Sequence, residues 1–337
     1  MKLGLLGFSG DSVKSRTDNL GIYRPESNRH IQGSNNGKIR TYQFYGQRQF
    51  WDSFNLLSIT GLTFKPDGTY VYVLSDANNT VYQQTITTPW DITIGNPPLT
   101  AVRELNTYLV SRTGNSYNLT APMGITFSPD GTKMHVADNW DRKIVQFSLS
   151  NPWMVDSATF TNTTVDNDRP IFYPSSINTI RDLCFSSDGT SLFTLSTNSQ
   201  NIMSVFRYSL NSGATPFDIG TKGTPNYTFI EGINISSFDS SMRGISFNSN
   251  GTKLYTCGLT EARIYEFNLA ESFLFSPGVT FNDNDIFYDG YLAGREGAPE
   301  AIYMNTTGNN SDFYVVGASN FFSGKVNIIY QYKMIQK

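Results

Sequence analysis

The sequence predicts an all-β fold, and three observations carry that prediction. Only 16% of the 337 residues are charged while 14% are aromatic, and Gly, Asn, Ser and Thr are abundant, which is typical of turn-rich β-proteins. One short motif recurs four times, at residues 61–69, 124–132, 182–190 and 244–252 (GLTFKPDGT, GITFSPDGT, DLCFSSDGT and GISFNSNGT). No segment shows the apolar spacing of three and four residues that an amphipathic helix requires. The repeat unit is therefore built from strands, and a helical repeat is excluded.

Each copy of the motif reads as a β-hairpin. An apolar run ends on an aromatic residue, and the Asp-Gly or Asn-Gly that follows forms the turn, in which Gly takes a positive φ without steric cost. An alternating second strand follows, such as YVYVL from Tyr70. Asp67, Asp130 and Asp188 precede the turn glycine at one register. A ring of metal-binding carboxylates is one interpretation, but each Asp is expected to cap its own turn at a separate hairpin tip.

A third and a fourth strand complete the unit. The third begins near residues 80, 143, 204, 263 and 328, for example TVYQQTI and KIVQFSL. Variable stretches such as 158–164 and 227–230 supply the fourth, outer strand. An aromatic residue recurs between the two, at Trp90, Trp153 and Phe273, with Trp51 and Phe217 close to the same register. Packing between strands is the expected role of these rings, and stacking on glycans is the alternative.

A four-stranded unit repeated about every 60 residues predicts a single β-propeller domain over residues 1–337. Weaker copies start at 21 and 300, so the blades start near 21, 61, 124, 182, 244 and 300. The expected fold is thus six four-stranded blades, with five or seven open because the first step is short. The last unit ends on its third strand. The ring would close if residues 3–8, within a closure segment 1–20, add that blade's outer strand.

Charge and residue usage exclude several function classes. Lys and Arg total 25 against 28 Asp and Glu, a net charge of −3, so the electrostatic attraction to nucleic acid or an anionic membrane is missing. Two cysteines cannot form a disulfide framework, and two histidines argue against a zinc site. We expect no cofactor and no metal. The N-terminus lacks the pattern of a signal peptide and no apolar run is long enough to span a bilayer, so a soluble protein made in the cytosol, without membrane insertion, is expected.

The residues just before each innermost strand are expected to crowd the mouth of the central channel. They are Thr60, Met123, Arg181, Arg243 and Glu300. Arg181 and Arg243 share a register on adjacent blades and could grip a carboxylate or a sugar acid through bidentate hydrogen bonds. The alternative is that they pair with Asp182, Glu296 or Glu300 and seal the channel.

No catalytic set is expected, and the protein is predicted not to be an enzyme. His135 falls in the register of Tyr72, Phe193 and Tyr255, and Cys257 in that of Leu74, so both are interpreted as packing residues. His30 has no partner in register, which leaves no Ser-His-Asp triad.

Recognition is expected on a face or the rim of the propeller. The stretches 99–118, 166–178, 221–237 and 278–295 carry the length differences between units, and such loops often bear binding residues. Candidate interface residues within them are Tyr108, Tyr117, Tyr173, Tyr227 and Tyr291, since tyrosine brings a large apolar area with few rotatable bonds. The alternative is that these tyrosines only cover the blades.

The repeats also resemble known families. The SPDGT hairpin followed by an alternating strand resembles the YVTN and WD40-like propellers. More narrowly, residues 81–93 (VYQQTITTPWDIT) and 144–159 (IVQFSLSNPWMVDSAT) are similar to the YQY-LSTAWDIST repeats of bacteriophage virion proteins. The resemblance implies a non-enzymatic tail or fibre component, located in the virion, whose partners are other virion proteins or a host-surface receptor or glycan.

Two other functions stay open. One is a metal-dependent lactonase-like propeller enzyme, although this chain has Ala121-Pro-Met-Gly and Ser241-Met-Arg-Gly where the lactonase motif is Pro-Asn-Gly. The other is a bacterial glycan-binding propeller.

Overall fold

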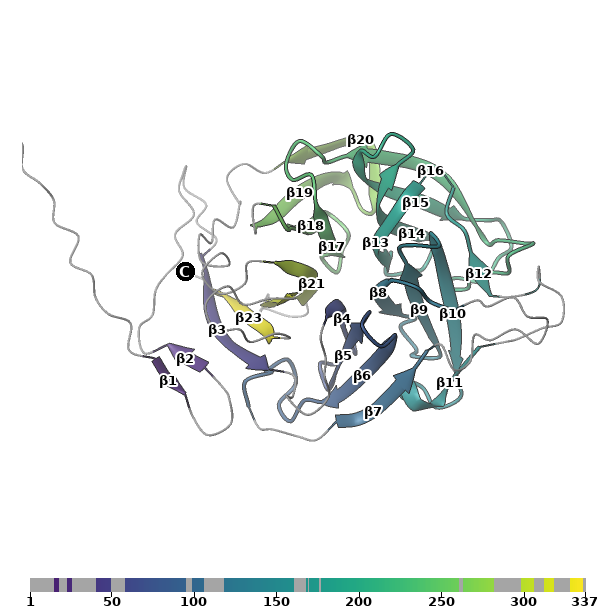
Figure 1. Ribbon diagram of the computed structural model, residues 1–337. Helices are drawn as coiled ribbons and strands as arrows, with labels where there is room; N and C mark the ends of the chain where they lie inside the picture. Colours follow the sequence, from purple (N-terminus) through teal and green to yellow (C-terminus); the bar gives the residue numbers. More distant parts are fainter. Residues whose placement is uncertain are drawn as a thin grey trace, which may run out of the picture.

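The computed structural model is a β-propeller of five blades arranged around a common centre (Figure 1). It describes residues 15–17, 23–25, 41–49, 58–94, 99–105, 118–160, 168, 170–175, 177–260, 263–281, 298–305, 312–317 and 328–335. Every described blade is antiparallel; the strands of the first four follow the order of the chain from the centre outward, and an N-terminal strand completes the fifth. The predicted all-β propeller is confirmed.

The inner strands form the wall of the central channel. They are β4 (Ile59–Phe64), β8 (Pro122–Phe127), β13 (Ile177–Phe185), β17 (Met242–Phe247) and β21 (Pro299–Asn305). Each contacts the next in this order, and β21 returns to contact β4, which closes the ring. The ring places one end of all five strands at each mouth of the channel.

The middle strands carry most of the core. They are β5 (Tyr70–Ser75) and β6 (Thr80–Thr85), β9 (Lys133–Asp138) and β10 (Lys143–Leu149), β14 (Ser191–Asn198) and β15 (Met203–Leu210), β18 (Lys253–Gly258) and β19 (Arg263–Glu271), and β22 (Asp312–Gly317) and β23 (Ile328–Ile335). The third strands therefore lie where the sequence predicted them.

The outer strands vary in length. They are β7 (Leu99–Glu104), the short pair β11 (Ala158–Thr159) and β12 (Ile171–Phe172), then β16 (Tyr227–Asn234), β20 (Leu274–Phe281) and β3 (Thr41–Gln49). A short 3-10 helix, η2 (Val155–Ser157), precedes β11, and β1 (Ser15–Thr17) and β2 (Tyr23–Pro25) extend the sheet beyond β3.

The prediction of six blades is wrong. The weak repeat copy at residue 21 forms no blade of its own, because its last part is β3, a single strand within the fifth blade. A blade needs an inner and a second strand of its own, and the described strands of this copy are only β2 and β3, which belong to the sheet of the fifth blade. The distance of 40 residues between the copies at 21 and 61, against about 60 between the others, indicated that the first copy is not a full blade.

The ring is closed by an N-terminal strand on the C-terminal blade, as predicted, but by a different strand. β3 pairs antiparallel with β23, from Thr41 opposite Ile335 to Gln49 opposite Ile328. Residues 3–8, the expected closure strand, lie outside the described residues. The free edge of β23 needs a long partner, and β3 covers it along its whole length.

Aromatic contacts hold neighbouring blades together. The aromatic residue that ends an inner strand packs on the second strand of the preceding blade, with ring centroids 4.5 Å apart for Phe127 and Tyr72 and 4.6 Å apart for Phe247 and Phe193. Phe64 packs in the same way on Tyr314 across the closing seam, at 4.4 Å. The repeated aromatic register is therefore an interface between blades.

The hairpin turns explain the Asp-Gly register. Gly131 has a φ of 71°, and the predicted positive φ is confirmed at all four turn glycines. In that turn Asp130 Oδ1 accepts hydrogen bonds from Thr132 N at 3.0 Å and Thr132 Oγ1 at 2.8 Å. The aspartates are turn residues, as expected. The ring of Trp153 lies directly over Gly131, so the recurring aromatic covers a glycine and does not stand free.

A glutamine on the third strand joins the first, second and fifth blades to the blade that follows each of them, whereas the third and fourth blades have Arg207 and Glu266 at this position. Gln83 Oε1 accepts from Val155 N at 3.0 Å, and Gln146 Oε1 accepts from Ile219 N at 3.0 Å. At the seam, the buried Gln331 does the same with Ile92 N at 3.1 Å and also donates to Trp90 O at 2.6 Å. The third-strand glutamine therefore accepts a hydrogen bond from the next blade, two residues after that blade's recurring aromatic residue.

Replacing Gln331 by Leu is expected to destabilise the protein by about 2 kcal/mol, because the N–H of Ile92 loses its partner inside the fold, and Trp90 O and Asp312 Oδ2 each lose one donor. Leu has nearly the volume of Gln, so packing changes little. Urea unfolding of Gln331→Leu beside the exposed Gln200→Leu measures the effect. Equal stability of the two variants would show that the glutamine contact does not hold the seam.

Candidate functional site

A β-bulge recurs at one register in all five inner strands. In β4 the pairing with β5 passes from Ile59 to Gly61, which leaves Thr60 without an opposite residue. The same shift skips the equivalent residue of the other four blades, which are Met123, Arg181, Arg243 and Glu300. A bulge re-aims the extra side chain. The residues that the sequence placed at the channel mouth are therefore the five bulge residues.

Three charged bulge residues lie near one another on consecutive blades. Arg243 Nε lies 3.5 Å from Glu300 Oε2, and both side chains are mostly buried. Burial lowers the pKa of Arg181, and the adjacent Arg243 lowers it further, whereas Glu300 opposes the shift. Among the described residues Arg181 Nε has no hydrogen-bond partner. The Arg243–Glu300 ion pair is one of the pairings expected for a sealed channel, and Glu296 lies outside the described residues.

Asp182 is not a partner of these arginines. Its carboxylate accepts hydrogen bonds from Leu183 N at 2.8 Å and from Ile245 N in the next blade at 2.9 Å. On the other side it occupies the space above Gly124, where a Cβ would lie 2.4 Å from Asp182 Oδ1. Burial raises the pKa of Asp182 to about 7, against these hydrogen bonds. This carboxyl group therefore connects three blades.

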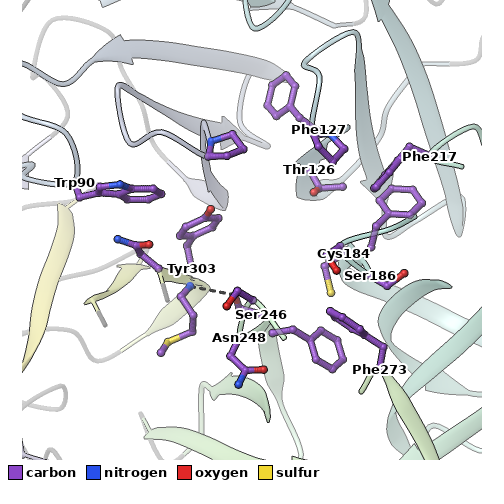
Figure 2. A pocket seen from close by; sticks show the side chains of 18 residues that line it. Trp90, Thr126, Phe127, Cys184, Ser186, Phe217, Ser246, Asn248, Phe273 and Tyr303 are labelled. Carbon is purple, nitrogen blue, oxygen red and sulfur yellow. Dashed lines mark hydrogen bonds between the residues drawn. The ribbon is translucent and has the colours of Figure 1, made fainter. Parts of the chain in front are cut away.

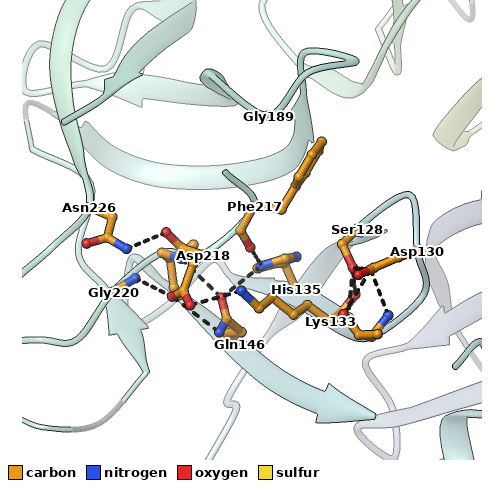
Figure 3. A network of polar contacts seen from close by, with 12 residues as sticks. Ser128, Asp130, Lys133, His135, Gln146, Gly189, Phe217, Asp218, Gly220 and Asn226 are labelled. Atoms are coloured by element: carbon orange, nitrogen blue, oxygen red, sulfur yellow. Dashed lines mark hydrogen bonds and ion pairs between the residues drawn. The ribbon is translucent and has the colours of Figure 1, made fainter. Parts of the chain in front are cut away.

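His135 is a packing residue, as predicted. It is fully buried, its ring meets Phe185 edge-on, and Nε2 lies 3.1 Å from Gln146 Oε1 and 3.0 Å from Phe217 O (Figure 3). Lys133 and Asp218 form an ion pair at 2.9 Å beside it. Burial lowers the pKa of His135 to about 4. The imidazole is neutral at pH 7 and takes the place that a tyrosine hydroxyl has in other blades, such as Tyr72, which donates to Trp153 O.

The thiols are not activated. Cys257 is fully buried in a hydrophobic cluster, which confirms its core role. Burial raises the pKa of both Cys257 and Cys184, so both remain protonated. Within the described ranges, no group of three or more His, Cys, Asp or Glu side chains is placed to hold a metal ion. No helix in the described part of the chain has the length and apolar character needed to cross a membrane.

A pocket lies at the opposite mouth of the channel, where the inner strands end and the Asp-Gly hairpins begin. It has a volume of about 250 Å³ (Figure 2). Its lining comes from all five blades and includes the rings of Trp90, Phe217 and Tyr303, and none of the described residues that line it is charged. The sequence analysis missed this pocket. The sequence feature that indicates the pocket is a set of residues three positions after each bulge residue, among them Thr126 and Ser246.

The candidate interface tyrosines have different positions. Tyr173 is 43% exposed and belongs to the outer edge of the second blade. Tyr227 is buried, with its hydroxyl donating to Gly189 O at 2.6 Å, so it cannot be an exposed contact residue. The aromatic side chain supports the turn of its own blade instead. Tyr108, Tyr117, Tyr291 and Trp51 lie outside the described residues.

One exposed aromatic residue was missed. Trp140, in the turn between β9 and β10, is 75% exposed, and its backbone N–H donates to Asp138 Oδ1 at 3.0 Å. Because Asp138 pairs with Pro122 at the start of β8, this turn lies on the same face as the bulge residues. Its exposure could have been predicted, because this Trp lies in the polar sequence NWDRK between two predicted strands.

Comparisons with known proteins find solved structures that are similar to this one, but no matching family. No protein-family model and no curated protein matches the sequence. The structure is similar to a candidate 6-phosphogluconolactonase from Bacteroides fragilis, with a TM-score of 0.41 and 12% identity over 72% of this chain and 63% of that one. This chain thus spans less than two thirds of that protein. A functionally unknown protein from Desulfotomaculum acetoxidans gives 0.41 and 15%, over 85% and 90% of the two chains. A chain of a nidogen/laminin complex gives 0.40 and 12%, over 86% and 84%.

Proposed function

We propose that the protein is a non-enzymatic interaction component of a bacteriophage particle, in its tail or fibres. The propeller is a rigid disc that contacts other virion proteins or a receptor or glycan on the host surface. The place in a virion rests on the similarity of the Trp-Asp-Ile segments to virion repeats. The structure adds a physical reason for those segments, since their Gln and Trp residues join blade to blade.

The observation that carries the non-enzymatic role is the state of the reactive groups among the described residues. His135 is buried and neutral, and Cys184 and Cys257 are protonated thiols. Glu300 is paired with Arg243, and Asp182 with two backbone N–H groups. A general base or a nucleophile must reach a substrate with a pKa suited to its task. These groups are instead occupied in holding blades together.

Exposed apolar side chains support recognition. Trp140 presents most of its indole to solvent on the face that carries the bulge residues. Tryptophan is among the residues that contribute most to protein interfaces when a partner covers it. Tyr173 offers a second ring at the edge of the disc.

Particle analysis tests the location. Virions from the source culture are purified on a density gradient, and the protein is quantified by mass spectrometry against the major capsid protein. We expect a fixed ratio across the particle peak. Recovery only in the particle-free fraction would overturn the virion role.

Metal analysis tests the lactonase alternative. The purified protein is assayed for bound calcium and zinc and for hydrolysis of aliphatic and sugar lactones. We expect neither a stoichiometric metal nor turnover. Lactone hydrolysis that stops when a chelator removes a stoichiometric metal would overturn the non-enzymatic role.

A further inference from the structure

We propose that the aromatic pocket at the hairpin mouth of the channel binds one neutral sugar ring, such as the terminal hexose of a glycan. The inference goes beyond the proposed role, because a sugar could bind there wherever the protein works. It rests on the size of the pocket, the absence of charge among the described residues that line it, and three hydroxyl-bearing side chains in that lining.

The lining joins rings to hydroxyl groups. Trp90 and Tyr303 lie almost parallel, with an interplanar angle of 20° and centroids 6.1 Å apart, on one side of the pocket (Figure 2). Phe217 and Phe273 come from other blades. One face of a pyranose ring carries C–H groups and is apolar, while its edge carries hydroxyls. A site for it needs aromatic surface beside a few converging polar groups, which is the usual composition of a ligand pocket.

The hydroxyl groups come from a single register of the inner strands. Thr126, Ser246 and Tyr303 each lie two residues after the residue that follows the bulge, and Cys184 occupies this place in β13. Within the described part of the chain, neither Tyr303 nor Thr126 has a hydrogen-bond partner for its hydroxyl. Ser246 Oγ accepts from Met304 N at 3.1 Å, which leaves its proton available to donate. Burial raises the pKa of Tyr303, so its phenol stays a neutral donor.

The charge of the lining selects among ligands. A carboxylate or a phosphate here would lose water without gaining a cationic partner, which is costly. A wholly apolar ligand would fill the pocket but give no acceptor to the hydroxyl protons of Thr126, Ser246 and Tyr303. A neutral sugar ring satisfies both requirements. The volume, about 250 Å³, lies just below the range of about 300–1,000 Å³ usual for pockets that hold larger ligands, so it suits a single ring.

The test uses saturation-transfer NMR and titration with methyl glycosides of glucose, galactose, mannose and N-acetylglucosamine, beside the anionic sugars glucuronate and N-acetylneuraminate. We expect at least one neutral glycoside to bind and the anionic sugars not to bind. Tyr303→Phe keeps the ring and removes the hydroxyl, so it should weaken binding about three- to tenfold, the value of one neutral hydrogen bond.

A second variant blocks the pocket at its rim and leaves Thr126, Ser246 and Tyr303 unchanged. Ser187 lines the mouth, is exposed, and occupies the second position of its hairpin turn, which accepts most residues. Ser187→Trp should therefore fold and abolish binding, whereas Ser187→Ala should leave it unchanged. Arg181→Gln, at the other mouth, is a further control that should not affect a neutral sugar.

Three results would overturn the proposal. They are no binding of any neutral glycoside, neutral binding that survives Ser187→Trp, and binding of an anionic sugar that Arg181→Gln removes. The last result would place the ligand at the arginine mouth. None of these results bears on whether the protein belongs to a virion, which the particle analysis measures separately.

Discussion

A Gly131→Val variant is expected to lose about 4 kcal/mol of folding stability. Two effects add. Gly131 has a φ of 71°, a conformation that costs a β-branched residue roughly 1–3 kcal/mol. A Cβ would also lie 2.4 Å from Nε1 of Trp153, so the indole must move, and forcing a packed side chain aside costs about 1–3 kcal/mol more.

The chain offers a matched control at Gly213. Its φ is 79°, but a Cβ there would meet nothing within 4 Å. Gly213→Val should therefore show the backbone cost alone, about 1 kcal/mol. Urea unfolding of both variants separates the two effects. If both variants lose the same free energy of unfolding, the indole of Trp153 moves aside at no energetic cost. The packing of Trp153 on Gly131 then contributes little to the stability of the blade.

We expect the full chain to be a monomer and the variant without residues 1–49 to form larger species. The deletion takes away β3 and leaves the backbone of β23, from Ile328 to Ile335, without its outer partner. An unpaired edge strand with buried neighbours is a template for pairing with another chain. Size-exclusion chromatography with light scattering measures the result, and most of the truncated protein should elute ahead of the monomer.

Two comparisons make this prediction specific. A protein lacking only residues 1–14 keeps every described strand and should remain monomeric. Adding a peptide of the β3 sequence, TYQFYGQRQ, to the longer deletion should restore the monomer, since an extended peptide can add to a free sheet edge. Aggregation of the short deletion, or no rescue by the peptide, would show that β3 is not the closing strand.

The sequence predicts the blades well where a hairpin defines them. An aromatic residue, an Asp or Asn, and a Gly at fixed spacing determine two strands and a turn locally, so the sequence shows the copies at 61, 124, 182 and 244. It also shows the weaker copy at 300. An outer strand has no turn of its own, so the sequence of residues 41–49 does not show that this strand belongs to the last blade and not to a separate blade starting near 21. Alternation of side chains is the same in a third strand and an outer strand. Only pairing with β23, almost 290 residues away, distinguishes them.

The candidate site was only half visible in the sequence. The register of Arg181, Arg243 and Glu300 could be read, because a bulge recurs at the same distance from the hairpin in every blade. Burial could not be read for Tyr227, which looked like a loop residue but fills the space beneath its own turn. The pocket was missed because its lining residues become neighbours only when five strands meet.

Closure by β3 also determines the order in which the protein can fold during synthesis. The ribosome releases β3 before any of the five inner strands, while its partner β23 is the last of the described strands to emerge, so β3 must wait until these blades have been made. Contacts between such distant parts of a chain form late in folding. Four blades can be complete while the fifth lacks its outer strand. A chain that ends before β23 therefore cannot close the ring. Its unpaired strands stay exposed, and chaperones or proteases can recognise them.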